Sequence, residues 1–265
     1  MAFFQVNFFS NVLEMNTSMN VILPQEGVTD IGINRNSMDN GYPTIYLLHG
    51  MSDDHSGWTR KTSIERYAEK YGFAVVMPTT YLGWYTDTCY GLNYWSFISE
   101  ELPKICRDFF PHMSKRREDT FAAGLSMGGY GAFKLGLARP DIFGAAASLS
   151  GALNMADDSN KESFEKNKTF FQGIFGSPEQ LKNSHNDLFY LAEQLAASDK
   201  EKPKFYLWCG EQDFIYKHSV DMEKKLIALG LDIEAHYSDG AHEWIYWDRE
   251  IQNVLGWFDG IRRAK

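Results

Sequence analysis

A serine between two glycines is the feature of this chain that points most directly to chemistry. Residues 121–131 read FAAGLSMGGYG, with Ser126 two residues after Gly124 and two before Gly128. A serine in this pattern can occupy a sharp turn between a strand and a helix, where its hydroxyl projects above the sheet. Glycines suit such a turn because larger side chains would collide across it. We predict that Ser126 is a nucleophile; the alternative is a serine that only caps the helix N-terminus.

A serine hydroxyl needs a base to take its proton as it attacks. The chain has seven histidines. Where a nucleophile stands on such a turn, an acid and then a histidine follow later in the chain, and the histidine comes after the last strand. His242, in the loop SDGAHEW, occupies this place, so we predict that it is the base; a polar residue capping the next helix is the alternative. His236 shares the polar face of the last expected strand with Glu234, which predicts a surface position.

An acid must hold the tautomer of the imidazole and stabilise its charged form. It should follow the strand that precedes the histidine's own strand, here the apolar run 205–209. Glu211 and Asp213 both stand in the loop after this run. Asp213 is favoured, because the loop must carry the carboxylate across the sheet edge and Glu211 lies too close to the strand end.

Two backbone N–H groups are expected to stabilise the oxyanion that forms when a carbonyl is attacked. One belongs to the residue after the nucleophile, Met127. The other is expected in the loop after the strand 44–48, where we assign it to Met51. Gly50 lets the backbone approach closely at this point.

Short apolar runs alternate with helical patterns and predict the elements that position these residues. Such runs indicate strands buried on both faces, and their alternation with helices indicates a parallel sheet wrapped by helices. An antiparallel pair at a sheet edge is expected near the N-terminus. The expected strands are 3–9, 17–23, 44–48, 73–77, 121–124, 145–149, 205–209 and 233–237. The expected helices are 60–70, 93–109, 127–138, 218–229 and 244–263, with a loop over 24–41.

The segment 151–202 is longer than a plain crossover requires. Its helical pieces, 161–174 and 178–197, are expected on the rim where the C-terminal ends of the strands open. We interpret the segment as a cap over the site; a solvated surface excursion is the alternative. Because no linker or repeat divides the chain, residues 1–265 are predicted to form a single domain that carries this cap.

Composition narrows the classes of partner. The net charge of −9 and the lack of a lysine- or arginine-rich block argue against nucleic acid. No apolar stretch approaches the about eighteen residues of a membrane span, and the N-terminus lacks the pattern of a secretory signal. Three scattered cysteines show no disulfide framework. We expect a cytoplasmic protein that acts on a small-molecule substrate, with no metal and no cofactor. Whether it forms a homo-oligomer is left open.

The motifs above belong to a larger set of segments. These are LLHGMS (47–52), GWYTDT (83–88), ELP (101–103), GLSMGGYG (124–131), WCGEQDF (208–214) and AHEW (241–244). Together they resemble the esterase D / tributyrin esterase family of α/β-hydrolases over nearly the full chain. The resemblance implies the α/β-hydrolase fold, a mostly parallel central sheet with helices on both faces and a small helical cap.

The same resemblance implies a serine carboxylesterase that hydrolyses short-chain acyl esters, such as acetyl, butyryl or tributyrin-like esters, through an acyl-serine intermediate. Residue by residue it supports Ser126, Asp213 and His242 as a catalytic triad, with Met51 and Met127 as oxyanion donors.

Other activities remain open from these segments. S-formylglutathione hydrolases share the GWYTD-like and GLSMGG segments but would carry a threonine–cysteine pair where this chain has Ser52-Asp53-Asp54. Feruloyl and acetylxylan esterases resemble the same branch. An acyltransferase would pass the same acyl group to an alcohol or sugar, and a binding module would keep only the scaffold.

Aromatic residues follow the strand 73–77 on the side where a substrate would lie. Trp84 and Tyr85, with Trp58 and Trp95, can wall an acyl or aromatic pocket next to Gly50. The alternative is that they belong to the core, since 15% of the chain is aromatic.

Overall fold

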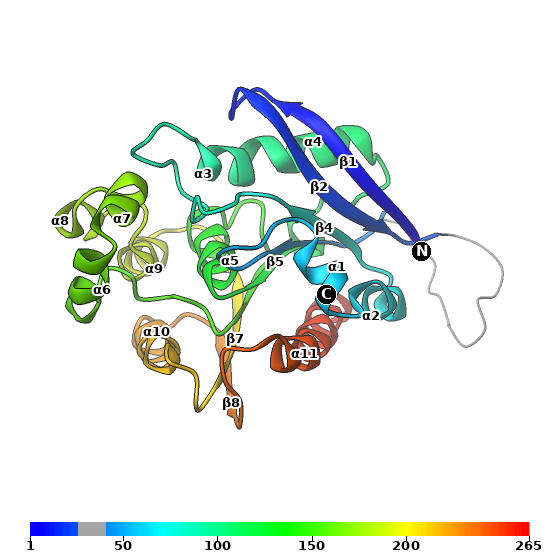
Figure 1. Cartoon of the computed structure of the whole chain (residues 1–265). Coiled ribbons are helices and arrows are strands. Elements are labelled where there is room, and N and C mark those ends of the chain that lie inside the picture. The colour runs from blue at the N-terminus through cyan, green and yellow to red at the C-terminus, as the bar shows by residue number, and fades with distance from the viewer. Residues whose placement is uncertain (26–40, 265) are drawn as a thin grey trace.

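One sheet forms the centre of the molecule (Figure 1). The structure, a computed structural model, describes residues 1–25 and 41–264, so most of the loop expected over 24–41 lies outside the described residues. The strands are β1 (Ala2–Ser10), β2 (Met15–Leu23), β3 (Thr44–Leu48), β4 (Ala74–Pro78), β5 (Thr120–Leu125), β6 (Ala145–Leu149), β7 (Lys204–Gly210) and β8 (Ile233–Ser238).

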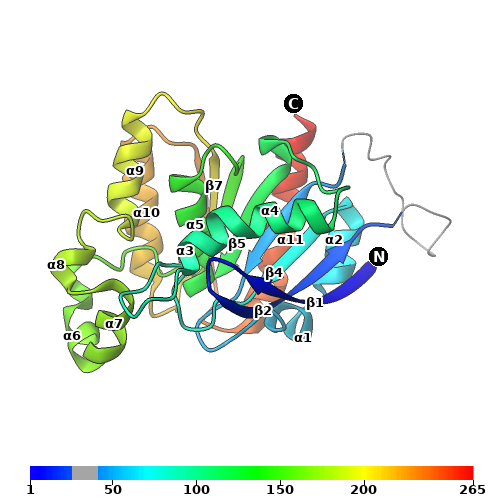
Figure 2. The ribbon, with the colours of Figure 1, turned by 90° about the horizontal axis from the view of Figure 1, so that it is seen from above.

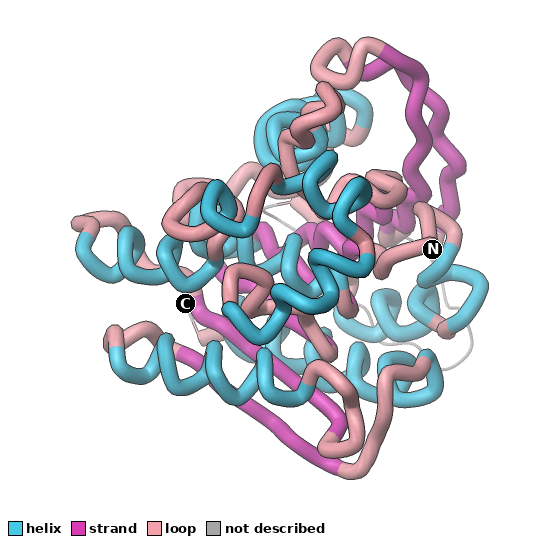
Figure 3. Tube along the Cα trace, turned by 60° about the vertical axis from the view of Figure 1, so that its left-hand side comes forward, coloured by secondary structure: helices cyan, strands magenta, loops and turns pink. Residues whose placement is uncertain are grey.

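The order of the strands across the sheet is β1-β2-β4-β3-β5-β6-β7-β8. β1 pairs with β2, and β2 with β4, in antiparallel fashion, while every other neighbouring pair is parallel. Figure 3 shows the two N-terminal strands together at one edge. The expected mostly parallel sheet and its antiparallel edge pair are thus confirmed, and the parallel strands place their C-terminal ends along one edge.

Helices cover both faces of the sheet (Figures 1 and 2). The α-helices are α1 (Gly57–Lys61), α2 (Ile64–Tyr71), α3 (Tyr94–Ser96), α4 (Leu102–Phe109), α5 (Met127–Ala138), α6 (Lys161–Lys166), α7 (Lys168–Phe175), α8 (Pro178–Leu181), α9 (Leu188–Ala197), α10 (Tyr216–Ala228) and α11 (Trp244–Arg263). The other helical turns are a π-helical turn, η1 (Phe97–Glu101), and two 3₁₀ turns, η2 (Arg117–Asp119) and η3 (Asp158–Asn160).

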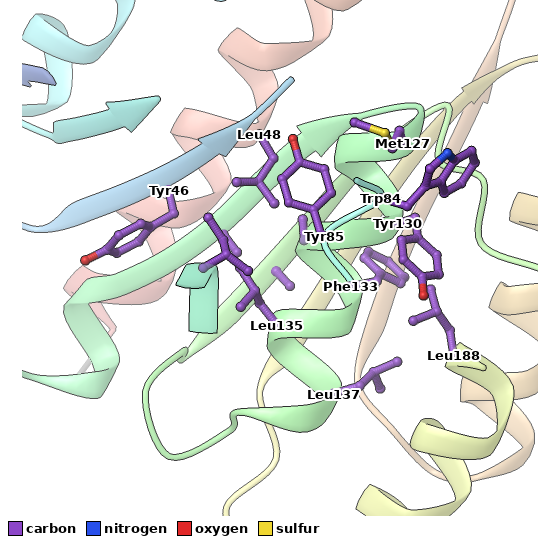
Figure 4. Close-up of a cluster of buried hydrophobic side chains, with 14 of the residues drawn as sticks. Tyr46, Leu48, Trp84, Tyr85, Met127, Tyr130, Phe133, Leu135, Leu137 and Leu188 are labelled. Carbon is purple, nitrogen blue, oxygen red and sulfur yellow. The ribbon is translucent and has the colours of Figure 1, made fainter. Parts of the chain in front are cut away.

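Alternate residues of the central strands enter two separate cores, which explains their continuous apolar runs. In β3, Tyr46 and Leu48 pack on the side of α4, α5, α9 and α10, whereas Ile45 and Leu47 pack with α2 and α11. Figure 4 shows the first core, where the side chains of α5 meet those of β3. No helix in the described part of the chain is long and apolar enough to cross a membrane.

The helix expected over 60–70 is two helices. Thr62 adopts an extended conformation (φ −140°, ψ 172°) and separates α1 from α2. Its hydroxyl accepts a hydrogen bond from the Ile64 amide at 3.1 Å, which starts the second helix. Threonine competes for backbone groups in this way and so favours helix ends.

The helix expected over 93–109 contains the π-helical turn η1, followed at once by Pro103. Proline has no N–H to offer the carbonyl four residues earlier. That carbonyl belongs to Ser99, and it accepts a hydrogen bond from Arg139 Nη1 at 2.7 Å instead.

The pieces expected over 161–174 and 178–197 are four helices. Asp187 ends the second piece early, because its carboxylate accepts hydrogen bonds from the Phe189 and Tyr190 amides and caps α9. α9 packs against α5 and α10, as Figure 2 shows, while α6 to α8 lie beyond them.

Candidate active site

Ser126 occupies a tight turn between β5 and α5. Its φ of 53° and ψ of −118° are unusual for a residue with a side chain and cost on the order of 1–3 kcal/mol. A Cβ on Gly124 would lie 2.4 Å from the Gly128 carbonyl, and a Cβ on Gly128 would lie 2.4 Å from the Leu48 carbonyl oxygen. Only glycine fits at these two positions, so the strand, turn and helix hold the serine at the C-terminal edge of the sheet.

The structure brings three predicted side chains together at this edge. His242 Nε2 lies 3.0 Å from Ser126 Oγ, and His242 Nδ1 lies 3.0 and 2.9 Å from the two carboxylate oxygens of Asp213. The three residues follow β5, β7 and β8. This is the geometry in which an imidazole can take the serine proton while a carboxylate holds its other nitrogen.

The other candidates lie elsewhere. Glu211 is exposed, so the structure brings Asp213 and not Glu211 to the imidazole. His236 Nε2 pairs with Glu234 at 2.7 Å on the exposed face of β8, and its predicted surface position is confirmed.

Asp213 is set up as a charged hydrogen-bond acceptor. Its side chain has no exposed surface, and the Ile215 amide donates to Oδ1 at 3.1 Å. Burial alone would raise the pKa of Asp213, but hydrogen bonds from His242, the Ile215 amide and the Ser150 hydroxyl outweigh burial and lower the pKa. The carboxylate therefore stays ionised and faces the imidazole at neutral pH.

Aromatic rings hold the imidazole from two sides. The Phe214 ring lies 4.6 Å from the His242 ring, and the Trp247 ring meets it edge-on at 4.9 Å. Phe214 is 79% exposed, so it shields one side of the imidazole from solvent at the surface.

The loop after β3 carries the predicted oxyanion donor Met51 next to Ser126. A Cβ on Gly50 would lie 2.6 Å from Leu125 Cδ1 and 3.7 Å from Ser126 Cβ, so glycine allows the close approach that was expected. Met127 begins α5, where the first amides have no partner within the helix. The geometry leaves both N–H groups in the region of the serine hydroxyl.

His49 fixes the peptide that carries the Met51 amide. Its Nε2 accepts from the Thr80 N–H at 3.1 Å, which leaves Nδ1 to donate to the Gly50 carbonyl oxygen at 2.7 Å. Burial lowers the pKa of His49, which favours this neutral form. Because the Gly50 carbonyl and the Met51 N–H share one planar peptide, the hydrogen bond from His49 also sets the direction of that N–H.

Comparison with known proteins agrees with this geometry. The "Putative esterase" family model matches residues 10–258. The chain belongs to this esterase family. The acetyl esterase of Caldicellulosiruptor saccharolyticus is 30% identical over 266 residues, which cover 98% of this chain and 99% of that protein. The resemblance found in the sequence is confirmed, and this esterase is a carboxylic ester hydrolase.

Two solved structures from Staphylococcus aureus are similar over 97% of this esterase and 98% of their own chains. The fluorophosphonate-binding serine hydrolase FphF superimposes with a TM-score of 0.86 and is 32% identical. The S-formylglutathione hydrolase FrmB superimposes with a TM-score of 0.84 and is 33% identical. The α/β-hydrolase fold expected from the sequence is confirmed.

Trp84 and Tyr85 are core residues of this esterase, against the pocket role predicted for them. Tyr85 has no exposed surface, and its hydroxyl donates to the His49 carbonyl oxygen at 2.8 Å. Trp84 is 5% exposed and packs edge-on against Tyr130 and Phe175. The φ angles of both residues are near +50°, which turns their side chains inward beneath the oxyanion loop. Trp58 is buried too.

Lys134 was not singled out from the sequence, although it is the one charged residue within the apolar helix α5. The side chain is buried, and Nζ donates to the Tyr85 carbonyl, the Thr86 hydroxyl and Asn186 Oδ1 at 3.0, 3.1 and 2.7 Å. It thus ties the helix that follows Ser126 to the 84–86 loop and to the turn before α9. Burial lowers the pKa of Lys134 to about 7.

This lysine predicts a pH-dependent stability. Between pH of about 7 and 10.5 the unfolded chain holds a proton at Lys134 that the folded chain has lost, so the free energy of unfolding rises with pH. Relative to Lys134→Met, the natural esterase should gain up to about 1.4 kcal/mol per pH unit from about pH 7 to about pH 9. Denaturant titrations of both proteins across this range measure the gain, and a constant difference would contradict it.

Proposed function

We propose that this esterase is a serine carboxylesterase that hydrolyses short-chain acyl esters, with Ser126 as nucleophile. The proposal rests on one observation, the continuous hydrogen-bonded chain from Ser126 Oγ through His242 to Asp213. A serine held at a strained turn beside such a pair is the arrangement used for acyl transfer through a covalent intermediate.

The proposed reaction uses each group once in each half. Ser126 Oγ attacks the ester carbonyl carbon while its proton passes to His242 Nε2, and Asp213 stabilises the imidazolium. The carbonyl oxygen becomes an oxyanion held by the Met51 and Met127 N–H groups. When the tetrahedral intermediate collapses, the C–O bond to the alcohol breaks and the imidazolium protonates the departing oxygen. Water, losing its proton to His242, then attacks the acyl-serine and releases the acid.

The substrate class is supported by the relatives. The acetyl esterase with 30% identity acts, by its name, on the shortest common acyl ester. We also propose that α6 to α8 cap the acyl site. Phe175 of α7 packs against Trp84 at 5.5 Å and against Tyr130 at 6.2 Å, and the Tyr130 amide bonds the Ser126 carbonyl. The cap thus contacts the first helical turn after the nucleophile. All three cysteines are free, which supports the cytoplasm as the compartment.

A thioesterase is the second candidate. FrmB, at 33% identity over 97% of this chain, is named an S-formylglutathione hydrolase. The same triad would serve a thioester, since only the leaving atom changes. The residues Ser52-Asp53-Asp54 after the oxyanion loop depart from the threonine–cysteine pair of that family and favour the oxygen ester.

A substrate panel tests the proposal. We expect kcat/KM for p-nitrophenyl acetate or butyrate to exceed that for the octanoate by at least about tenfold, with tributyrin hydrolysed and S-formylglutathione and methyl ferulate turned over more slowly. A fluorophosphonate probe should label Ser126, and butyrate ester should slow the labelling. Preference for S-formylglutathione would establish the thioesterase, and acyl transfer to added glycerol in place of acid release would establish an acyltransferase. Absence of both turnover and labelling would refute the proposed function.

A further inference from the structure

Ser150 directly follows β6, the strand next to the one that carries Ser126. The two serines share a backbone feature, because the φ angle is +53° at Ser126 and +48° at Ser150. Glycine adopts such angles without steric cost, whereas a side chain makes them unfavourable. Ser150 is fully buried, so its hydroxyl is kept at this strained position away from solvent.

The hydroxyl of Ser150 has partners on both sides. Its Oγ accepts a hydrogen bond from Trp247 Nε1 at 3.1 Å. An indole N–H can only donate, so this bond leaves the hydroxyl proton free for an acceptor. The carboxylate of Asp213 is such an acceptor, and the Ser150 hydroxyl bonds to it. Trp247, at 4% exposed, and the unexposed Asp213 side chain exclude water from these contacts.

Trp247 also reaches the base. Its ring lies edge-on against the His242 ring at a centroid distance of 4.9 Å and an interplanar angle of 87°. Since α11 begins at Trp244, one turn of this helix connects the imidazole to the donor that orients Ser150. The contacts form a chain from Trp247 through Ser150 to Asp213, which in turn holds His242.

We propose that Ser150 and Trp247 are positioning residues of the catalytic triad: Trp247 fixes the Ser150 hydroxyl, and that hydroxyl fixes the Asp213 carboxylate on the imidazole. This inference rests on the proposed function, because it assumes that the triad performs the reaction. It assigns a catalytic purpose to a strained, buried serine that a glycine could replace on backbone grounds alone.

A shift in pH dependence distinguishes this role from a structural one. Besides His242, the titratable groups that face Asp213 are Cys209 at the end of β7 and His218 on α10. Removing the Ser150 donor raises the pKa of Asp213 and leaves more negative charge on the oxygens that face the imidazole. The protonated imidazole is then stabilised, so the acid limb of kcat/KM should move to higher pH.

The experiment compares Ser150→Ala, Ser150→Gly and Trp247→Phe with the natural protein. Ser150→Gly relieves the backbone strain while removing the hydroxyl, and Trp247→Phe keeps an aromatic ring while removing the N–H. Trp257→Phe is the matched control, because Trp257 lies on the same helix but packs against Tyr206 and Phe258, away from the triad. The measurements are kcat and KM for p-nitrophenyl butyrate across pH, with thermal unfolding to show that each variant folds.

Both Ser150 variants should lower kcat by about tenfold, as expected for a lost hydrogen bond to a charged group. KM should change little, and the acid limb should move to higher pH in both variants and in Trp247→Phe. Trp257→Phe should match the natural protein. A folded Ser150→Gly with natural kcat and pH profile would overturn the inference while leaving the proposed function standing. If Ser126→Ala retains activity, the proposed function itself fails.

Discussion

Ser126→Ala is expected to lower kcat for p-nitrophenyl acetate by about 10⁴- to 10⁶-fold. The change removes the atom that attacks the carbonyl, and no acyl-enzyme can then form at this position. The hydroxyl makes its hydrogen bond to His242 at the partly exposed site edge, so its loss leaves the core intact. The remaining rate would come from oxyanion stabilisation and substrate binding alone. Steady-state kinetics, with circular dichroism to verify folding, measure the effect.

The control for this change is Ser198→Ala. Ser198 lies at the end of α9, where its hydroxyl bonds the Leu195 carbonyl at 2.8 Å. That variant should keep full activity and label with the fluorophosphonate probe, whereas Ser126→Ala should not label. Substantial turnover by Ser126→Ala would mean that another residue attacks the ester.

Asp213→Asn should lower kcat by about 10³- to 10⁴-fold, the size seen for the corresponding change in a serine protease. The volume is unchanged, so the Ile215 amide can still donate to the side-chain oxygen. The asparagine NH₂ group, however, can donate to His242 Nδ1 and so favours the tautomer with hydrogen on Nε2. That nitrogen then faces Ser126 Oγ as a donor and cannot accept the serine proton.

Glu211→Gln is the matched control for Asp213→Asn. Both residues stand in the loop after β7, but Glu211 is exposed and Asp213 is the one within 3.0 Å of His242. The glutamine variant should retain nearly full activity at every pH tested. If Glu211→Gln causes the larger loss, the acid has been assigned to the wrong side chain.

Much of the fold could be predicted because local patterns and tertiary packing agree. Strand β3 coincides with its predicted range, as do helices α5 and α11, since each has a continuous apolar run or face bounded by turn residues. The interruptions were missed. The break at Thr62 and the π-helical turn before Pro103 depend on where freed backbone groups find partners, such as Arg139 for the Ser99 carbonyl. Periodicity does not carry that information.

The site shows the same division. The order of Ser126, Asp213 and His242 along the chain was readable because each follows a strand of a parallel sheet, and the structure brings the three within hydrogen-bonding distance. Tyr85 was misplaced because its φ near +50° turns the ring into the core, and non-glycine residues at such angles leave no clear mark in a sequence. Lys134 and Ser150 gain their partners from distant segments and were not singled out for the same reason.

The distance along the chain between the two halves of the site has a consequence for biosynthesis. Ser126 and its base are 116 residues apart, and the base follows the edge strand β8. A ribosome therefore makes the nucleophile long before the imidazole that activates it. The nascent chain stays chemically silent until β8 has joined the sheet, so the onset of ester cleavage marks the completion of folding.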